Sequence, residues 1–369
     1  MKKTHLLAAT LALAGTAAAQ AQSSVQIYGF YDAAVERLSN VNAAGDSLVR
    51  MPNLTGGIGP TRLGFTGAED LGGGLKAIFT LEMGIAPDSG AFNQGGRAFG
   101  RQSFVGLSGG WGSVTFGRVY TMLGGSIAGV DVIGPSNYSI GSLDPYLPNA
   151  RSDNAISYQG KFGGFSAGAT YSLGRDASAA GGPGATNCFG ESGTDKRACR
   201  QWSALLRYDA ANFGGTIGYD TYNGGAGAAA AFGPTSSSLS DSRLNLGAYG
   251  KFGPFKVGGG VLRRENEGVT ASAANNPRSN LWYLGATYQL TPAVTFDAEV
   301  ARLDVKDSAN DTNMVVLRGI YSFSKRTAVY AMLGNVRNKG TAARSIASGA
   351  TAGPGSRQTG IMTGLKHSF

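Results

Sequence analysis

The 369-residue sequence contains few of the side chains from which enzyme sites are usually built. It has two histidines and two cysteines, and His367 is the only histidine beyond residue 5. A zinc site needs three or four such ligands, and a serine nucleophile needs a histidine base. The glycines at 72–74 are followed by no lysine or helix pattern that would hold a nucleotide. We therefore expect no enzyme, no metal and no cofactor.

The sequence also lacks long apolar runs. No stretch approaches the ~18 uninterrupted apolar residues that a membrane-spanning helix needs. Basic residues are scattered in runs of at most two, although the net charge is +9. This dispersion argues against a nucleic-acid partner. Glycine is abundant instead, with 59 residues, which is typical of tight turns, closely packed strands and long surface loops.

The first residues predict an export signal. Lys2 and Lys3 precede a short apolar run, and a small-x-small tripeptide ends at Ala21. We expect residues 1–21 to be a signal peptide and residues 22–369 to be one barrel domain. The alternative is a helix of the folded protein. Removal of the two lysines would lower the charge from +9 to +7, because 30 basic residues would then face 23 acidic ones.

Short segments of alternating polarity recur from Val25 to the last residue. In 294–301, for example, Phe296 and Val300 alternate with Asp297 and Glu299. We expect about sixteen strands, at 25–36, 61–68, 75–81, 103–108, 113–118, 154–158, 166–171, 202–208, 216–221, 242–250, 255–263, 281–289, 294–302, 314–322, 326–336 and 356–369. The segment 314–322 is mixed, because Val316 and Ile320 fall on its polar side.

Short and long connections alternate along the chain. The expected long loops are 37–60, 82–102, 119–153, 172–201, 222–241, 264–280, 303–313 and 337–355. This rhythm is typical of an up-and-down antiparallel barrel with two unlike ends. A β-sandwich has no reason to keep it, and no fixed sequence repeat indicates a solenoid. The predicted fold class is therefore an all-β transmembrane antiparallel barrel.

Charged residues inside apolar strands support a water-filled barrel. At about sixteen strands the interior is too wide for side chains to fill, so inward charges meet water. This accounts for Arg62, Asp297, Glu299 and Arg318. In a soluble core each would need a partner or cost several kcal/mol. The chain ends on an alternating strand whose last residue is Phe369, and other aromatic residues fall near strand ends, as in interfacial girdles.

Several stretches resemble the Gram-negative general-diffusion porins, in particular their beta-proteobacterial trimeric branch. The stretches are 23–29, TRLGFTGAEDLGGGLKA at 61–77, FGRQSFVGLSG at 99–109, SKRT at 324–327 and GLKHSF at 364–369. The resemblance implies a homotrimer in contact with outer-membrane lipids, including lipopolysaccharide, with one pore per subunit. It also implies that Phe369 serves as an assembly signal.

The resemblance further implies that the third long loop, about 119–153, folds into the barrel and narrows it. In the family, wall arginines face acidic residues of this loop. The matching arginines are Arg62, Arg101 and Arg151, and loop membership suggests Asp131 and Asp144 as their partners. Alternation supports inward directions for Arg62 and Arg151. Arg101 shares its parity with Val105 and Leu107, so alternation does not support it.

These observations predict a pore for small hydrophilic solutes and ions, and three arginines against two aspartates predict a preference for anions. The alternative is a surface barrel that acts as an adhesin or structural protein and conducts little. A long third loop with opposed charges favours the pore. Cys188 and Cys199 lie in one loop of an exported chain, which favours a disulfide over two free thiols.

Overall fold

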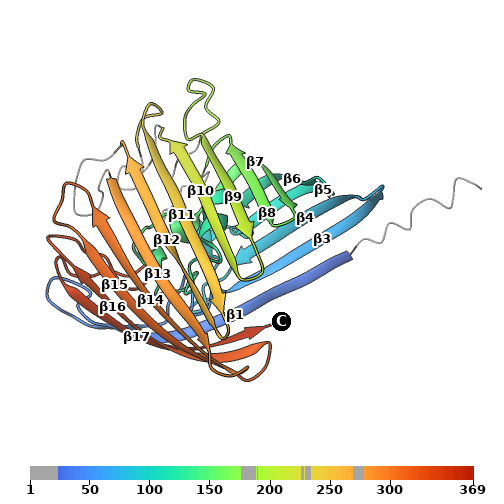
Figure 1. Cartoon of the computed structure of the whole chain (residues 1–369). Coiled ribbons are helices and arrows are strands. Elements are labelled where there is room, and N and C mark those ends of the chain that lie inside the picture. Colours follow the sequence, from blue (N-terminus) through green and yellow to red (C-terminus); the bar gives the residue numbers. More distant parts are fainter. Residues whose placement is uncertain (1–23, 176–187, 189, 226–227, 229–233, 269–277) are drawn as a thin grey trace, which may run out of the picture.

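The computed structural model describes residues 24–175, 188, 190–225, 228, 234–268 and 278–369. The expected signal peptide at 1–21 lies outside these residues. The described chain forms one large antiparallel sheet that closes on itself (Figure 1). None of the helices in the described ranges is long and apolar enough to cross a membrane.

The sheet contains seventeen strands. Their bounds are β1 (Ser24–Leu38), β2 (Leu48–Arg50), β3 (Arg62–Gly72), β4 (Leu75–Gly84), β5 (Gln102–Gly109), β6 (Gly112–Tyr120), β7 (Arg151–Phe162), β8 (Phe165–Ser172), β9 (Gln201–Asp209), β10 (Phe213–Asn223), β11 (Ser240–Phe252), β12 (Phe255–Asn266), β13 (Arg278–Gln289), β14 (Val294–Val305), β15 (Thr312–Ser322), β16 (Thr327–Asn338) and β17 (Arg357–Ser368). The short helices are α2 (Asn93–Gly96), α3 (Met122–Ile127), η1 (Ile140–Ser142) and η2 (Leu147–Asn149).

Strand β1 closes the barrel. Its first half pairs with β3, from Ser24 opposite Ala68 to Phe30 opposite Arg62. Its second half pairs with β17, from Phe30 opposite Ser368 to Leu38 opposite Gly360. The three-residue β2 only adds a short pairing to β1 within the first long loop. Without β2 the barrel has the sixteen strands that the sequence predicted.

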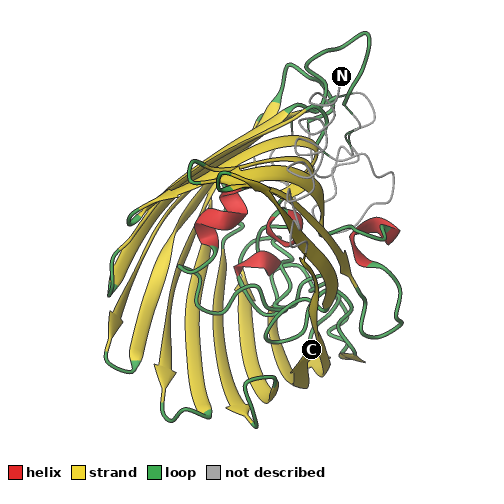
Figure 2. Ribbon diagram, turned by 90° about the vertical axis from the view of Figure 1, so that its right-hand side faces the viewer, coloured by secondary structure: helices red, strands yellow, loops and turns green. Residues whose placement is uncertain are grey.

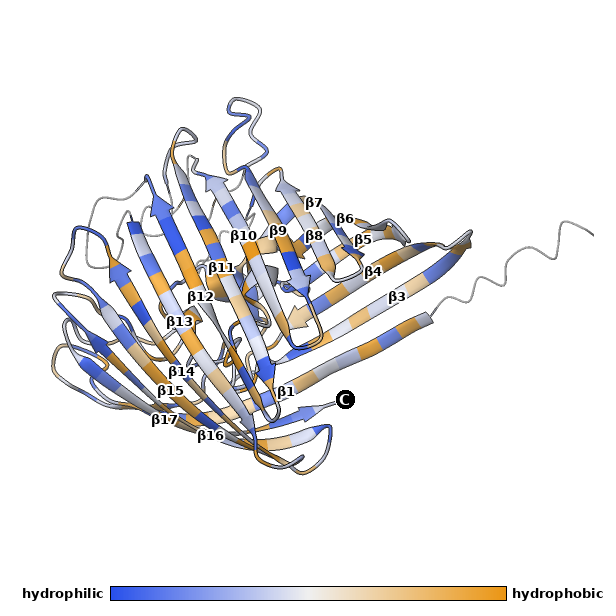
Figure 3. Ribbon diagram, viewed as in Figure 1, coloured by the Kyte–Doolittle hydropathy of each residue, from blue (hydrophilic) through white to orange (hydrophobic). Residues whose placement is uncertain are grey.

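Side chains alternate between the two faces of the wall, as the sequence predicted. Along β14, Phe296 and Val300 are exposed on the outside, while Asp297 and Glu299 are buried from the outside. The same alternation runs round the barrel, where apolar and polar residues alternate along each ribbon (Figure 3). An outward apolar band is what lipid requires, because lipid cannot solvate polar side chains.

Part of the interior is filled by an apolar cluster that joins the long connection between β6 and β7 to the wall. Leu123, Val130, Ile140 and Leu143 of this connection pack with inward residues of β11–β17. Val316 belongs to the cluster and is fully buried. This explains the mixed strand of the sequence: Val316 faces inward, but it meets protein rather than water.

Inward glycines leave room for the same connection. A Cβ on Gly360 would stand 2.6 Å from the Tyr138 hydroxyl, and one on Gly334 would stand 3.0 Å from the Tyr138 ring. A Cβ on Gly258 would meet the Val130 carbonyl at 2.4 Å. The wall therefore has no side chains at these positions, which lets the connection between β6 and β7 pack directly against the strands.

Candidate functional site inside the barrel

The connection between β6 and β7, residues 121–150, is called loop 3 below. Its helical segments lie within the ring of strands (Figure 2). The Thr121 side chain caps α3 by accepting from the Gly124 N–H. The Met122 N–H donates to the Ser203 hydroxyl at 2.9 Å, and Asn245 donates to the Ser126 hydroxyl at 3.1 Å. These bonds hold the start of loop 3 against β9 and β11.

Arg318 of β15 holds the middle of loop 3 in place. Its guanidinium donates to the Ile133 carbonyl at 3.0 Å and to the Gly57 carbonyl of the first long loop at 2.7 Å. Asp297 on the neighbouring strand accepts from it at 2.8 Å. A buried guanidinium with several acceptors is well satisfied. Arg318 thus joins two inward-folded loops to one stretch of wall.

Asp144 holds the end of loop 3 to the wall. Its two oxygens accept from the Arg243 guanidinium at 2.8 and 3.1 Å, and both side chains are buried. Burial alone would raise the pKa of the Asp144 carboxyl. Arg243 and Arg264, with the hydrogen bonds that the carboxylate accepts, outweigh burial and hold this pKa well below its usual range. Asp144 is therefore an anchoring carboxylate.

The structure brings Arg62, Arg101 and Arg151 together; these three are called the arginine group below. Arg101 pairs with Glu82 at 2.8 Å, and Arg62 approaches the same carboxylate at 3.8 Å. Arg151 donates to the Tyr120 hydroxyl at 3.0 Å and lies 4.4 Å from the centre of that ring. Arg101 also donates to this hydroxyl. Glu82 and Tyr120 therefore hold the group together.

The members of the group differ in exposure. The Arg62 side chain is 28% exposed, whereas that of Arg101 is 4% exposed. Arg62 lies 4.5 Å from the centre of the Phe30 ring, and Lys366 lies 4.7 Å from the same ring. Among the arginines, Arg62 thus meets the water of the interior. The arginine group and Glu82 together carry a formal charge of +2, from three cations and one carboxylate.

Asp131 and Asp144 lie elsewhere. In the described part of the chain, no ion pair joins either aspartate to the arginine group. Asp131 accepts from the N–H groups of Ile133 and Gly134 in its own loop, at 3.1 and 2.8 Å. It faces Glu299 of the wall. The expected acidic partners from loop 3 are replaced by Glu82 of β4.

Two residues of the site escaped the sequence prediction. Glu82 lies just beyond the predicted end of its strand at 81, and Tyr120 lies at the predicted start of loop 3. Extending the predicted strand by one residue, from 81 to 82, would have given Glu82 the inward direction of Thr80, which lies two positions earlier. Arg101 precedes β5, so strand parity does not govern its side chain.

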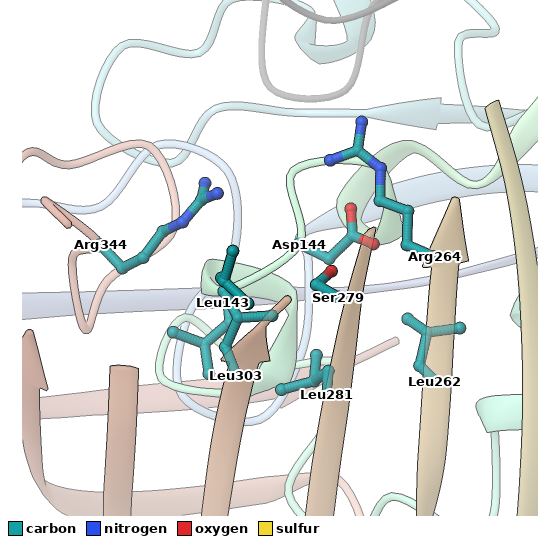
Figure 4. A pocket seen from close by; sticks show the side chains of 9 residues that line it. Leu143, Asp144, Leu262, Arg264, Ser279, Leu281, Leu303 and Arg344 are labelled. Atoms are coloured by element: carbon teal, nitrogen blue, oxygen red, sulfur yellow. The ribbon is translucent and has the colours of Figure 1, made fainter. Parts of the chain in front are cut away.

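A small pocket lies between loop 3 and the wall (Figure 4). Arg264 and Arg344 approach it from opposite sides, and Asp144 lies between them. The rest of its lining is mostly apolar, with Leu143 from loop 3 and Leu262, Leu281, Leu303 and Val305 from β12–β14. The pocket therefore marks the seam where Asp144 anchors loop 3.

Two further predicted residues lie away from the interior site. The Phe369 N–H donates to the Gly29 carbonyl at 3.2 Å, and the Phe369 ring covers Gly29. Cys188 and Cys199 are joined in a disulfide with their Cα atoms 5.3 Å apart. The Arg175 N–H donates to the Cys199 carbonyl at 3.0 Å, which ties the bridged segment to the end of β8.

Comparison with known proteins gives consistent matches. The family model for Gram-negative porins matches residues 8–341. Outer membrane porin protein 32 of Delftia acidovorans is 31% identical over 392 aligned residues, which cover 100% of both chains.

Solved structures match as well. The anion-selective porin from Comamonas acidovorans superposes with a TM-score of 0.74 at 28% identity, covering 94% of this chain and 100% of that one. OmpT of Vibrio cholerae in its trimer form superposes with a TM-score of 0.62 at 15% identity, covering 94% of this chain and 99% of that one, which shows a shared fold.

Proposed function

Because the chain belongs to the family of Gram-negative porins, we propose that its outer-membrane channel passes small hydrophilic solutes and prefers anions. The family consists of channel proteins, not enzymes. An adhesive surface barrel with little conductance has no support among the matched proteins, which are porins. The solved relative from Comamonas acidovorans is described as anion-selective, which agrees with the proposed preference.

The position of the arginine group carries the proposal. The contacts of loop 3 with Ser203, Asn245, Arg243 and Arg318 lie on β9, β11 and β15. The arginine group lies around β3 to β7 and contacts the end of loop 3, where Arg151 donates to the Pro148 carbonyl at 3.0 Å. We place the passage beside the exposed part of Arg62, where the group and Glu82 give a formal charge of +2. At ~0.15 M salt the Debye length is about 8 Å, so these charges act across a narrowed passage.

The selectivity mechanism is a local excess of positive charge. Glu82 offsets part of the charge of Arg62 and Arg101, and no carboxylate in the described ranges pairs with Arg151. An anion that enters the passage loses part of its hydration shell and is attracted by the charge of Arg62, whereas a cation is repelled. Asp131 and Asp144 of loop 3 have other partners, so the arginine group sets the sign of the electrostatic potential in the passage.

The decisive experiment is the reversal potential of the purified protein in a planar bilayer across a salt gradient. The parent should give an anion-selective potential. The double variant Arg62→Ser/Arg151→Ser should conduct more, because side-chain volume is lost, and its potential should move toward cations, because two charges are lost. If the double variant kept the parent's conductance and ion preference, the assignment of the constriction would be wrong.

Two controls separate charge from width and from folding. Arg62→Gln keeps most of the side-chain volume, so it should shift the potential with little gain in conductance. Arg278→Ser removes an exposed arginine that pairs with Asp307 at 2.9 Å on the extracellular end of β13. This variant should behave as the parent in both measurements.

The proposal includes export and assembly. Cleavage after Ala21 would leave Gln22 as the mature N-terminus, which N-terminal sequencing of the outer-membrane form tests. We place the mature chain in a homotrimer in contact with outer-membrane lipids, including lipopolysaccharide; the trimer form described for OmpT supports this assembly. A heat-sensitive oligomer of three chains on electrophoresis is the expected result.

The Cys188–Cys199 bridge should form in the exported protein. Peptide mapping without reduction should give one cross-linked peptide pair. Replacement of both cysteines by serine should leave conductance unchanged, because both cysteines lie outside the barrel strands. Two thiols that alkylate without reduction would contradict the bridge.

A further inference from the structure

Two lysines lie inside the barrel at the end that carries the short turns. Lys251 and Lys256 stand directly opposite each other on β11 and β12, next to the turn that joins these strands (Figure 1). Lys251 has the same face of the wall as Gly247, and Lys256 has the same face as Gly258. Both glycines lie against Val130 of loop 3, so both lysines point into the interior. Short turns mark the periplasmic end of such barrels.

Three cations lie around one aromatic ring at this end. The centre of the Tyr249 ring lies 5.7 Å from the Lys251 ammonium nitrogen and 5.4 Å from that of Lys256. The guanidinium carbon of Arg207 lies 5.8 Å from the same centre. The ring therefore gathers cations from β9, β11 and β12 in one place.

Lys161 extends the cluster along the wall. It stands opposite Ser166 of β8, and Ser166 stands opposite Arg207 of β9, so Lys161 and Arg207 lie at the same level two strands apart. The Lys161 charge also acts on the Asp209 carboxylate. We call Lys161, Lys251 and Lys256 the mouth lysines.

The Asp209 carboxylate of this cluster already has its partners. It accepts from the Arg207 guanidinium at 2.7 and 2.9 Å and from the Tyr249 hydroxyl at 2.8 Å. In the described part of the chain, no ion pair involves a mouth lysine. The three mouth lysines and Arg207 against Asp209 give a local formal charge of +3.

Two further carboxylates act on Lys256 without pairing with it, those of Asp131 and Asp297. Asp297 is paired with Arg318 at 2.8 Å, and Asp131 accepts from N–H groups of its own loop. Like charges directly opposite on neighbouring strands are unfavourable. An anion held between Lys251 and Lys256 would therefore relieve a repulsion that the described residues leave in place.

We propose that the mouth lysines, gathered around Tyr249, form a second anion site in the channel, which binds the dianionic head of small phosphate monoesters. The proposal rests on the proposed channel function and names a substrate class for it. A lysine ammonium binds phosphate as a point charge with rotatable donors, so it selects charge more than shape. Several such charges without carboxylate partners favour a compact dianion over a monoanion, because the attraction grows with the charge of the ligand.

The position of the site suits a solute in transit. Arg207 donates to the Ala128 carbonyl of loop 3 at 2.7 Å, so the site lies beside loop 3 on its periplasmic side. Lys161 and Lys251 are exposed to the water of the interior. A bound anion can therefore leave quickly, as conduction requires.

The test is a phosphorus NMR titration of methyl phosphate with the purified protein, at about pH 8, where this monoester is a dianion. Binding to the large protein broadens the phosphorus signal. Lys251→Gln/Lys256→Gln should weaken the binding about tenfold, since each partly exposed ion pair contributes a few-fold. Lys251→Arg/Lys256→Arg should keep most of the binding, because it keeps both charges.

The matched control is Lys76→Gln/Lys325→Gln, which removes two lysines from the same end of the barrel. Lys76 stands opposite Asp70 on β3, and Lys325 lies between β15 and β16, so neither belongs to the cluster. This control should bind methyl phosphate as the parent does. Dimethyl phosphate, a monoanion of similar shape, should bind the parent several-fold more weakly than methyl phosphate.

Four results would overturn the proposal. The first is equal binding of methyl phosphate by the parent and Lys251→Gln/Lys256→Gln. The second is an equal loss in the control, which would reduce the effect to net charge. The third is equal binding of both phosphates by the parent, which would remove the preference for a dianion. The fourth is a full loss of binding in the arginine variant, which would show that the substitutions act through the fold.

Conductance separates this site from the proposed function, because the titration does not need a conducting channel. A parent that binds methyl phosphate but does not conduct would refute the proposed function and leave the site standing. A parent that conducts anions but does not bind methyl phosphate would refute the site alone. In planar bilayers, methyl phosphate should reduce the chloride current of the parent at lower concentration from the side of the short turns than from the other side. A block with no preference for either side would contradict the position of the site.

Discussion

At the scale of single residues, the interior charges fall into two kinds. Arg318 and Arg243 are buried and have fixed acceptors, so they hold loops in place. Arg62 keeps part of its side chain in water and shares its carboxylate partner with Arg101. A buried charge with fixed partners stabilises the fold, whereas a partly hydrated charge can also attract or repel a passing ion. Arg62 is therefore the residue most directly available for selectivity.

Glu82→Gln tests this division. The amide keeps the size of the side chain and removes the negative charge beside Arg62 and Arg101, which raises the formal charge of the region from +2 to +3. We expect a stronger anion preference in the reversal potential. Buried Arg101 would lose its ion-pair partner, which commonly costs about 3–5 kcal/mol, so a lower melting temperature is expected as well.

The matched control is Glu265→Gln, which removes an exposed carboxylate on the outer surface. It should leave the reversal potential unchanged and alter stability by less than about 1 kcal/mol. An unchanged or more cationic potential in Glu82→Gln would contradict the proposed role of the arginine group.

The sequence predicted which way these residues point better than it predicted what they touch. Alternation placed Arg62, Asp297 and Arg318 inward because it fixes the face of each residue along a strand. The partner of an inward residue depends on the stagger between strands and on the route of the loops. The pairing of Asp144 with Arg243, which is 99 positions away, therefore could not be derived from spacing.

At the scale of elements, the strands and loop 3 follow different rules. Every predicted strand exists, because turn residues and alternation are local signals. The length of loop 3 was predictable, but its path depends on contacts with distant inward residues. The short β2 was missed, since three residues carry no periodicity. The sequence showed that these glycines belong to strands. It did not show their contact with Tyr138, which requires a small residue at those positions.

Gly360→Ala tests the contact between loop 3 and the wall. The new Cβ would stand 2.6 Å from the Tyr138 hydroxyl and 3.0 Å from Leu38, so the loop has to shift. Overpacking of this kind commonly costs about 1–3 kcal/mol. Single-channel recordings should show an altered conductance level and noisier open states.

Gly319→Ala is the corresponding control on β15. A Cβ there would lie 3.5 Å from the Phe296 ring, which is ordinary contact. Its recordings should match those of the parent. If Gly360→Ala and Gly319→Ala behaved alike, the close fit of loop 3 against β17 would have no bearing on the passage.

At the scale of the whole molecule, the barrel has two unlike halves. Loop 3 and the inward apolar residues of β11–β17 form a packed interior, whereas the arginine group lies around β3 to β7, at the end of loop 3. Closure depends on β1, which pairs with β3 along one half and with β17 along the other. The final residue adds one bond to this seam, from Phe369 to Gly29.

Deletion of Phe369 should lower the yield of outer-membrane protein severalfold. The deletion removes the last bond of the seam and the ring that covers Gly29, and unpaired strand edges are costly in lipid. Quantitative immunoblotting of isolated outer membranes measures the yield. Phe323→Ala, which removes another exposed aromatic ring at the same end of the barrel, is the control and should have a smaller effect. A normal amount of oligomer from the deletion would argue against this role.

Because β1 pairs with both β3 and β17, the barrel can close only after the last strand has been made. Gly29 and Phe369 are 369 − 29 = 340 positions apart, so the seam cannot form before synthesis is complete. A nascent chain would carry fifteen of the sixteen barrel strands and still have two open edges, which invite association with other chains. Contacts of such long range also form slowly. Closure of the barrel is therefore the last pairing event, and the edges of β1 and β16 stay unpaired until β17 is in place.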